Sequence, residues 1–361
     1  MKWRRFVQLM MAVLVFLLLA LVAVFVWLVP QRGAGIVGTK GRAADQQWRF
    51  LFAVYGPGVG RVEWFARPQG VATDGKRLYV TDTDNHRVVV FDDRGHYLRS
   101  VGSFGLRISQ GKPSPAWRAG QLAWPTDSAA APDGTIWVAD TVNRAIQRFD
   151  PAGRAAVVVP ATTRPDDFAP GKAAHATLLE RPLSVTVADN RIYVADGFRV
   201  SRFGIDGSPQ GIFGQRQGGR RVGAMLQPWG MIVDARGSVA VADALNHRVE
   251  AFSPEGKLLW MTSTPTTQGA AGSTGAEEIF ALPRGMDRDS AGRIYVADAL
   301  RSKITVLSAN GRKLIDLGDM GRMPAELFLP NDVALTRSGT IFVADKGNNR
   351  VQAFRLNVSL P

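Results

Sequence analysis

The sequence predicts an all-β fold, a six-bladed β-propeller, and two observations support this prediction. First, a four-residue phrase occurs six times: an aromatic residue or Ala is followed by Val, then by Ala or Thr, and then by Asp. The six copies end at Asp82, Asp140, Asp196, Asp243, Asp298 and Asp345. Second, a proline opens each unit, and successive opening prolines lie 57, 57, 46, 55 and 47 residues apart. A repeat of this length indicates small units that bury their apolar faces only by packing against one another.

Each unit is expected to form four strands. In the first unit the strand-like runs are residues 70–72, 78–81, 87–91 and 97–102. The dipeptides Asp74-Gly75 and Arg94-Gly95 are tight-turn signals between these runs. Residues 88–91 read Val-Val-Val-Phe, without the alternation of a sheet that has one wet face, so both faces should be buried. Small sheets that are buried on both faces and repeated six times predict a propeller.

The two ends of the chain are expected to complete the same blade. The last unit stops at Pro361 without the outermost strand that other units have, and residues 49–55 match residues 97–102 of the first unit. A ring with free ends would expose a sheet edge. We therefore predict that residues 49–55 add to the final sheet and close a propeller that spans residues 48–361.

The loop that follows the repeat Asp resembles that of a known family. Asp82-Thr83-Asp84-Asn85-His86-Arg87 and Asp243-Ala244-Leu245-Asn246-His247-Arg248 resemble the NHL repeat family, named after an Asn-His-Leu phrase, and the resemblance covers roughly residues 48 to 358. It implies a propeller of four-stranded NHL-type blades. Proteins of this kind include scaffolds, peptide-amidating lyases and RNA-binding cytosolic proteins, so the resemblance does not choose a function.

Within these loops a structural role is expected for the polar residues. Arg144 and Asn349 occupy the position of His86 and His247, and a position that accepts Arg is not a metal-ligand position. The repeat Asp should accept hydrogen bonds from loop amides or pair with a basic residue five positions later. The residues with this expected role are Asp82, Asn85, His86, Arg87, Asp140, Asn143, Asp196, Asp243, Asn246, His247, Arg248, Asp298, Asp345, Asn348 and Arg350.

A membrane anchor is expected ahead of the propeller. Residues 6–29 contain no charge, and as a helix they would be about 36 Å long, enough to cross a hydrocarbon core of about 30 Å. A cleavable signal peptide is the alternative, but no small-x-small cleavage pattern follows the apolar run. We therefore expect a retained signal anchor, with residues 1–5 in the cytoplasm, residues 30–47 as a linker, and the propeller outside the cytoplasm, in the periplasm if the source is Gram-negative.

Composition favours an anionic partner without naming one. The formal net charge is +13 and there is no cysteine. A basic propeller near a bilayer attracts acidic headgroups, acidic glycans or acidic protein surfaces. A generally basic proteome is the alternative explanation of the charge. Nucleic acid is not expected as a partner, because RNA binding by such a propeller requires a cytosolic location, which the anchor disfavours.

One rim of the disc is the expected functional surface. The unequal repeat lengths place insertions at residues 106–123, 160–180 and 263–282, all in blade-to-blade connections on the rim that also carries the Asn-His-Arg loops. At this rim the innermost strands should begin after each opening proline, around a central channel. The channel-mouth binding candidates are Gln69, Asp127, Ser184, Trp229, Arg284, Asn331 and Asp332.

Two functions remain open at the sequence level. The first is a non-catalytic binding or scaffolding module for a protein or anionic glycan partner, with no cofactor. The alternative is a metal-dependent enzyme, amidating-lyase-like or lactonase-like, with calcium or zinc in the channel. Asp127, Asn331 and Asp332 carry oxygens that calcium accepts, but solvated channel carboxylates are the expected state. No catalytic residue is assigned, because none of the histidines His86, His96, His175 and His247 lies on an innermost strand.

Overall fold

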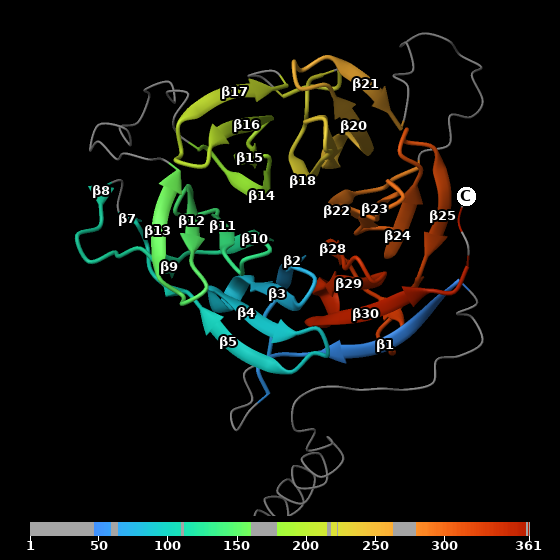
Figure 1. The fold of residues 1–361 in the computed structure, drawn as a ribbon, viewed down its shortest axis with the longest axis horizontal. Coiled ribbons are helices and arrows are strands. Elements are labelled where there is room, and N and C mark those ends of the chain that lie inside the picture. The colour runs from blue at the N-terminus through green and yellow to red at the C-terminus, as the bar shows by residue number, and fades with distance from the viewer. Residues whose placement is uncertain are drawn as a thin grey trace, which may run out of the picture.

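The computed structural model describes residues 47–58, 64–109, 112–159, 179–214, 218–221, 223–262, 279–358 and 360. They form six four-stranded sheets, arranged as blades around a common centre (Figure 1). All six of these four-stranded sheets are antiparallel. The predicted all-β six-bladed propeller is confirmed.

The blades are numbered I to VI from the first opening proline. Their innermost strands are β2 (Pro68–Thr73), β10 (Pro125–Ala130), β14 (Pro182–Ala188), β18 (Pro228–Val233), β22 (Pro283–Arg288) and β28 (Asp332–Leu335). The second strands are β3 (Arg77–Asp82), β11 (Ile136–Asp140), β15 (Arg191–Asp196), β19 (Val239–Asp243), β23 (Ile294–Asp298) and β29 (Thr340–Asp345).

The outer half of each blade has the same order. The third strands are β4 (Arg87–Asp92), β12 (Ala145–Phe149), β16 (Arg199–Gly204), β20 (Arg248–Phe252), β24 (Lys303–Leu307) and β30 (Arg350–Leu356). The outermost strands are β5 (Tyr97–Val101), β13 (Ala155–Val159), β17 (Pro209–Phe213), β21 (Leu258–Met261), β25 (Lys313–Leu317) and β1 (Trp48–Val54).

Strand β1 closes the ring, since it pairs antiparallel with β30 at the edge of blade VI. Trp48 stacks on Phe354 with ring centroids 3.8 Å apart, and Trp48 is only 1% exposed. In Figure 1 the blue strand lies beside the red one, so the two ends of the chain share a sheet. The strand that the sequence predicts at residues 49–55 therefore occupies the predicted place.

The apolar cores lie between neighbouring blades, which explains why the strands are apolar on both faces. Tyr79 and Val90 of blade I, for example, share a core with Ile136 and Phe149 of blade II. Blades V and VI pack in the same way, with Tyr295 against Val343 in one cluster. Each blade thus depends on both neighbours for its burial.

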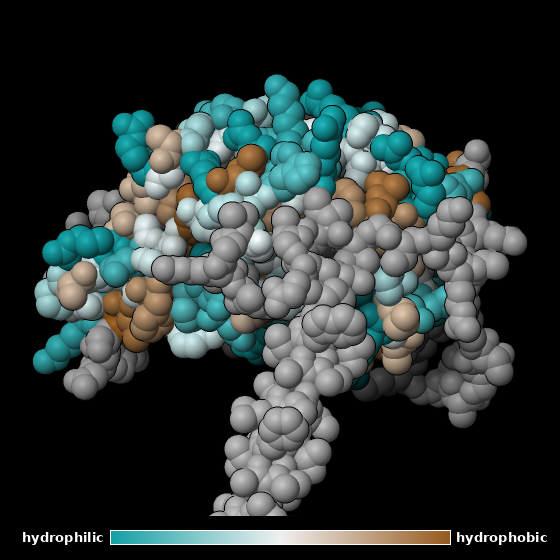
Figure 2. Space-filling view, turned by 90° about the horizontal axis from the view of Figure 1, so that it is seen from below, coloured by the Kyte–Doolittle hydropathy of each residue, from teal (hydrophilic) through white to brown (hydrophobic). Residues whose placement is uncertain are grey.

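Short elements decorate the connections. The two-residue strands are β6 (Ser103–Phe104), β7 (Ile108–Ser109), β8 (Lys112–Pro113), β9 (Gln121–Leu122), β26 (Asp319–Met320) and β27 (Glu326–Leu327). The 3-10 turns η1 (Thr83–Asn85), η3 (Ala244–Asn246) and η4 (Lys346–Asn348) follow the repeat Asp in blades I, IV and VI. In the side view of Figure 2 the coloured surface is largely hydrophilic, with separate brown apolar patches.

Several of the sequence predictions concern residues that the structure does not describe. The predicted anchor at residues 6–29, the linker, and most of the predicted insertions at 160–180 and 263–282 lie outside the described residues. Among the residues that are described, no helix has the length and apolar character needed to cross a membrane.

Candidate functional site

The repeat Asp of each blade fixes the connection that arrives from the previous blade. Its carboxylate accepts a hydrogen bond of 2.6 to 2.8 Å from the backbone N–H of the residue two positions before the opening proline. The donor and acceptor pairs are Ala66–Asp82, Ala123–Asp140, Glu180–Asp196, Leu226–Asp243, Ala281–Asp298 and Phe328–Asp345. The blade-to-blade connections and the loops after the second strands therefore share one face of the disc, here called the loop rim.

Side chains from the same loop complete the shell around each repeat Asp. The second oxygen of Asp345 accepts from the Asn348 amide at 2.8 Å, from Arg350 Nε at 2.7 Å and from Gln352 Nε2 at 3.0 Å. Equivalent bonds join Asn85 and Arg87 to Asp82, Asn143 to Asp140, and Asn246 to Asp243, while Arg199 and Arg248 form ion pairs with Asp196 and Asp243. Burial raises the pKa of Asp140 to about 7 and that of Asp243 to about 7.

His86 and His247 occupy a backbone position that explains their identity. Both have positive φ, 55° and 56°, and so does Asn349 at 50°. His and Asn tolerate the left-handed region better than most residues. His86 packs against the rings of Phe104 and Trp124, and His247 Nδ1 lies 2.5 Å from the carbonyl oxygen of Ala281. His86 therefore serves as a packing residue of the loop rim, and His247 as a hydrogen-bonding residue.

Three carboxyl groups on the innermost strands link adjacent blades. Asp127 accepts from its neighbour Ser128 N and from Val185 N of blade III, at 2.7 and 3.0 Å. Asp332 accepts from Val333 N and, at 2.8 Å, from Val71 N of blade I. Asp287 repeats the pattern between blades V and VI, accepting from Arg288 N and from Leu335 N at 2.7 Å. Here "channel carboxyls" means Asp127, Asp287 and Asp332.

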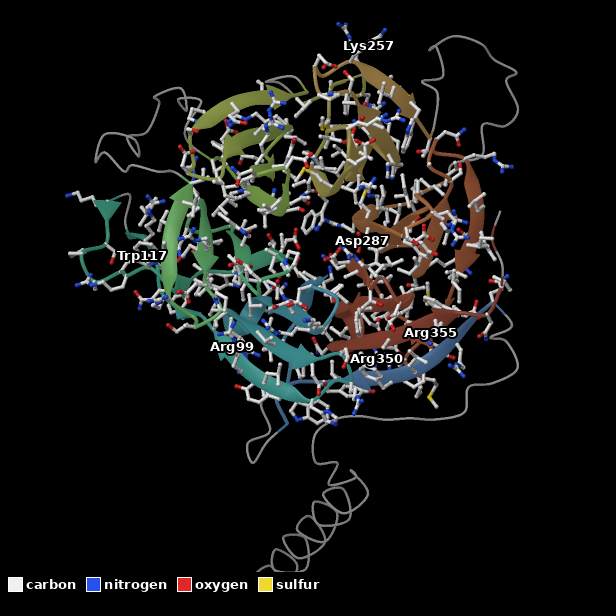
Figure 3. All side chains as sticks on the ribbon, in the orientation of Figure 1. Arg99, Trp117, Lys257, Asp287, Arg350 and Arg355 are labelled. Atoms are coloured by element: carbon white, nitrogen blue, oxygen red, sulfur yellow. The ribbon has the colours of Figure 1, made fainter. Side chains whose placement is uncertain are left out.

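Each of the channel carboxyls accepts two backbone N–H groups, and the expected solvation of Asp127 and Asp332 stays a prediction. All three line a cavity of about 210 Å³ between the innermost strands, and Figure 3 shows Asp287 near the centre of the ring. Burial raises the pKa of Asp127 to about 6 and that of Asp287 to about 6. Burial, followed by the charge of Asp127, also raises the pKa of Asp332 well above its usual range.

Asp287 is a channel residue that the sequence reasoning missed. It lies four positions after its opening proline, where the other blades have Ala72, Ala129, Thr186, Ile232 and Ala334. The sequence did contain a signal for Asp287, because it is the single carboxylate at a repeat position that otherwise holds small or apolar residues.

The channel offers a poor match to a metal site. Among the described residues no group of three or more His, Asp or Glu side chains is arranged to hold a metal ion. Asn331, a calcium candidate, is fully buried, and its amide donates to the carbonyl oxygen of Gln69 at 2.8 Å. Ser184 is 3% exposed and acts as a hydrogen-bond partner of Asp127. The set Asp127, Asn331 and Asp332 therefore does not form the oxygen cage that calcium requires.

At the loop-rim end of the channel a cation lies on an aromatic ring. The guanidinium carbon of Arg284 lies 3.9 Å from the ring centre of Trp229. Trp229 is 8% exposed and packs on Leu183 and Ala244. Arg284 Nε and Nη1 are buried and have no hydrogen-bond partner among the described residues. Two of the sequence candidates, Trp229 and Arg284, are thus in direct contact.

Further cations surround Arg284. Lys346 points to Asn331, with Nζ 3.5 Å from Oδ1, and burial together with Arg284 and Arg67 lowers the pKa of Lys346 to about 8. Burial and then the charge of Arg181 lower the pKa of Arg284 to about 10. Arg67 is neutralised by Asp84 at 2.5 Å. We call Arg181, Arg284 and Lys346 the cationic mouth; no carboxylate pairs with any of them in the part of the chain that is described.

Lys346 was not identified from the sequence. It follows the repeat Asp of blade VI, where the other blades have Thr83, Thr141, Gly197, Ala244 and Ala299. The signal was again one charge at a repeat position that otherwise holds small or neutral residues.

Comparison with known proteins finds similarity to NHL-repeat proteins over part of the chain. A family model described as NHL repeat matches residues 65–91 and 329–354. NHL repeat-containing protein 3 of Homo sapiens is 28% identical over 150 residues, which are 37% of this chain and 42% of that protein. E3 ubiquitin-protein ligase TRIM71 of Rattus norvegicus is 34% identical over 77 residues, 21% of this chain and 8% of that protein. The chain spans less than half the length of these curated relatives.

Solved structures share the architecture. A streptogramin B lyase has a TM-score of 0.54 at 13% identity, covering 88% of this chain and 100% of that chain. A gluconolactonase of Xanthomonas campestris has a TM-score of 0.53 at 15% identity, covering 89% and 99%. At such identities the similarity shows the fold alone. The chain is thus a six-bladed β-propeller, and two of its six repeats, those of blades I and VI, match the NHL repeat model.

Proposed function

We propose that this propeller is a non-catalytic binding module that holds an anionic group of a protein or glycan partner at the cationic mouth. The observation that carries the proposal is Arg284, whose buried Nε and Nη1 have no partner among the described residues. A buried polar group without a hydrogen bond is energetically unfavourable, and a buried cation more so. An anion entering the mouth would remove that cost.

The surroundings of Arg284 suit such a ligand. The ring of Trp229 lies against the guanidinium, and this cation–π contact favours one orientation of it. Lys346 adds a second donor within the same electrostatic environment, since burial and then the charge of Arg284 lower the pKa of Lys346. Charge-assisted hydrogen bonds from Arg or Lys to a carboxylate, sulfate or phosphate contribute about 1.5–3 kcal/mol each.

The proposed setting comes from the sequence. An anchor at residues 6–29 would leave the amino terminus in the cytoplasm and hold the propeller outside it, in the periplasm if the source is Gram-negative. The linker of residues 30–47 would keep the disc near the bilayer. No cofactor is part of this proposal.

Calorimetric titration of the full-length protein with an oligoglutamate peptide, and separately with a heparin oligosaccharide, tests the proposal. We expect at least one of these probes to bind, and Arg284→Gln to weaken that binding about tenfold or more. Arg355→Gln is the matched control, because Arg355 is exposed near the edge of the disc (Figure 3). Equal binding by wild type and Arg284→Gln would refute the proposal.

A metal-dependent enzyme is the second candidate. It is favoured by the raised pKa values of the channel carboxyls around one cavity, and by the fold shared with the lyase and the gluconolactonase. It is disfavoured because both oxygens of each channel carboxyl accept backbone amides. Stoichiometric calcium or zinc in the purified protein, lost in Asp127→Ala and Asp332→Ala, would move the function to this candidate.

A further inference from the structure

Four consecutive blades expose an apolar side chain at the same position of the loop rim. The position is the second residue after the repeat Asp in blades II to V. The residues are Val142, Phe198, Leu245 and Leu300, and their exposed fractions are 45%, 42%, 47% and 56%. We call them the apolar crescent. Because the four residues share one repeat position, they lie on the same rim of the disc.

Blades VI and I leave the crescent open. At the same position blade I has Asp84, which is bound to Arg67, and blade VI has Gly347. A side chain at Gly347 would have its Cβ 2.5 Å from the carbonyl oxygen of Phe328, so an apolar residue does not fit there. The open side of the crescent is therefore polar and adjoins Lys346.

The crescent and the cationic mouth belong to one surface. Ala244, the neighbour of Leu245, packs beneath the rim against Trp229, on which Arg284 lies. The neighbour of Gly347 is Lys346 of the mouth itself. The loop rim thus carries both the cations of the mouth and the half-exposed apolar side chains of the crescent.

We infer that the loop rim docks a segment of a partner protein that presents an acidic side chain among aliphatic residues. This inference rests on the proposed function and selects a protein over a glycan. The acidic group would enter the cationic mouth, and its aliphatic neighbours would cover the apolar crescent. A central charged anchor surrounded by apolar contacts that exclude water is the usual arrangement of a strong protein interface.

Val142, Leu245 and Leu300 are aliphatic, which argues against a glycan. Sugar hydroxyl groups laid on aliphatic side chains would lose water without gaining hydrogen bonds. Nucleic-acid bases need flat aromatic partners for stacking, and Phe198 is the single ring in the crescent. A bilayer is also a poor occupant, because the crescent side chains are only half-exposed and Nε and Nη1 of Arg284 are buried.

A positional-scanning library of short acetylated peptides, screened against the full-length protein, tests the inference. We expect enrichment of one acidic position flanked by aliphatic residues. The best peptide should bind about tenfold more weakly to Leu245→Ser and to Leu300→Ser. Leu259→Ser is the matched control, since Leu259 is 52% exposed in the outermost strand β21 of the same blade as Leu245.

The outcomes separate this inference from the proposed function. If Arg284→Gln abolishes peptide binding while Leu245→Ser and Leu300→Ser behave like Leu259→Ser, the anion site stands and the crescent does not dock a protein. If the crescent variants weaken binding of heparin or of phosphatidylserine vesicles instead of peptides, the occupant is a glycan or a membrane and the inference is wrong. If Arg284→Gln changes nothing, the proposed function fails as well.

Discussion

The channel carboxyls and Arg284 of the cationic mouth are both charged groups of the innermost strands, yet only the carboxyls have every oxygen hydrogen-bonded by the chain. Asp127, Asp287 and Asp332 each accept one backbone amide from their own strand and one from the next blade. Arg284, a few residues closer to the loop rim, has two buried N–H groups that donate to no described residue.

The difference separates a role in folding from a role in binding. A buried charge whose hydrogen bonds are satisfied by the chain holds the chain together. A buried charge that the chain leaves unsatisfied is stabilised when a ligand arrives. The carboxyls therefore join blades that have no continuous sheet between them, whereas the mouth remains available to a partner.

The largest expected difference between the channel carboxyls and Arg284 is in the effect of their removal on stability. Asp332→Ala should lower the free energy of unfolding by about 2–4 kcal/mol, because Val71 N–H and Val333 N–H would lose their acceptor in a buried place. Arg284→Met should leave the free energy of unfolding unchanged or raise it, because it removes a charge whose buried Nε and Nη1 have no hydrogen-bond partner among the described residues. Chemical denaturation of both variants measures the contrast.

Asp332→Asn is the control for this contrast, since one acceptor oxygen remains, and its loss should be smaller than that of Asp332→Ala. Equal destabilisation by Asp332→Ala and Arg284→Met would break the comparison. It would mean that both charges serve the fold.

A smaller effect concerns pH. The folded-state pKa values of about 6 for Asp127 and Asp287, and about 7 for Asp140 and Asp243, exceed the usual value of 3.8. Between pH 3.8 and these folded-state pKa values, the folded protein therefore binds more protons than the unfolded chain. The free energy of unfolding falls as pH rises through this range. Thermal unfolding should show a lower Tm near pH 7.5 than near pH 5.

One group opposes this trend with pH, and one variant tests it. His86, whose pKa is lowered by burial, acts in the opposite direction as a single group. Asp287→Asn, which copies the protonated carboxyl, should flatten the decline in Tm. A Tm that rises steadily from pH 5 to pH 7.5 would show that the channel carboxyls are ionised without strain.

The smallest effect is expected at the loop histidines. His86→Asn should change the free energy of unfolding by less than about 0.5 kcal/mol, because Asn takes positive φ readily and Asn349 already does so in blade VI. His86→Val should lose about 1–2 kcal/mol, because a β-branched residue is strained at positive φ. If His86→Asn were as damaging as His86→Val, the imidazole itself would have a function.

The repeats made the fold predictable. Because the phrase ending in Asp recurs at each second strand, the number of blades follows from counting it, and the match between residues 49–55 and 97–102 located the closing strand. The same alignment placed Trp229 and Arg284 in one layer of the ring. Each repeat position corresponds to one depth in the channel, so depth is readable from sequence.

The site could be predicted only in part. The repeat position of a residue gives its depth in the channel, but it does not give the direction of its side chain. Asn331 lies in the same layer as Arg284 but turns its amide to the Gln69 carbonyl. Asp332 reaches across to blade I rather than into solvent. Such choices depend on how closely neighbouring strands approach. At Gly285 an added Cβ would lie 1.7 Å from an oxygen of Asp332, a crowding that no repeat pattern reveals.

The most direct test of the central claim follows the proton on Lys346. Its pKa of about 8 should rise when an anion binds beside it, so binding at pH 8 should draw protons from the buffer. Calorimetry with the oligoglutamate peptide in two buffers of different ionisation enthalpy measures this uptake. We predict an uptake of about half a proton in the wild type and none in Lys346→Gln. Binding without proton uptake, or the same uptake in both proteins, would contradict an anion site at the cationic mouth.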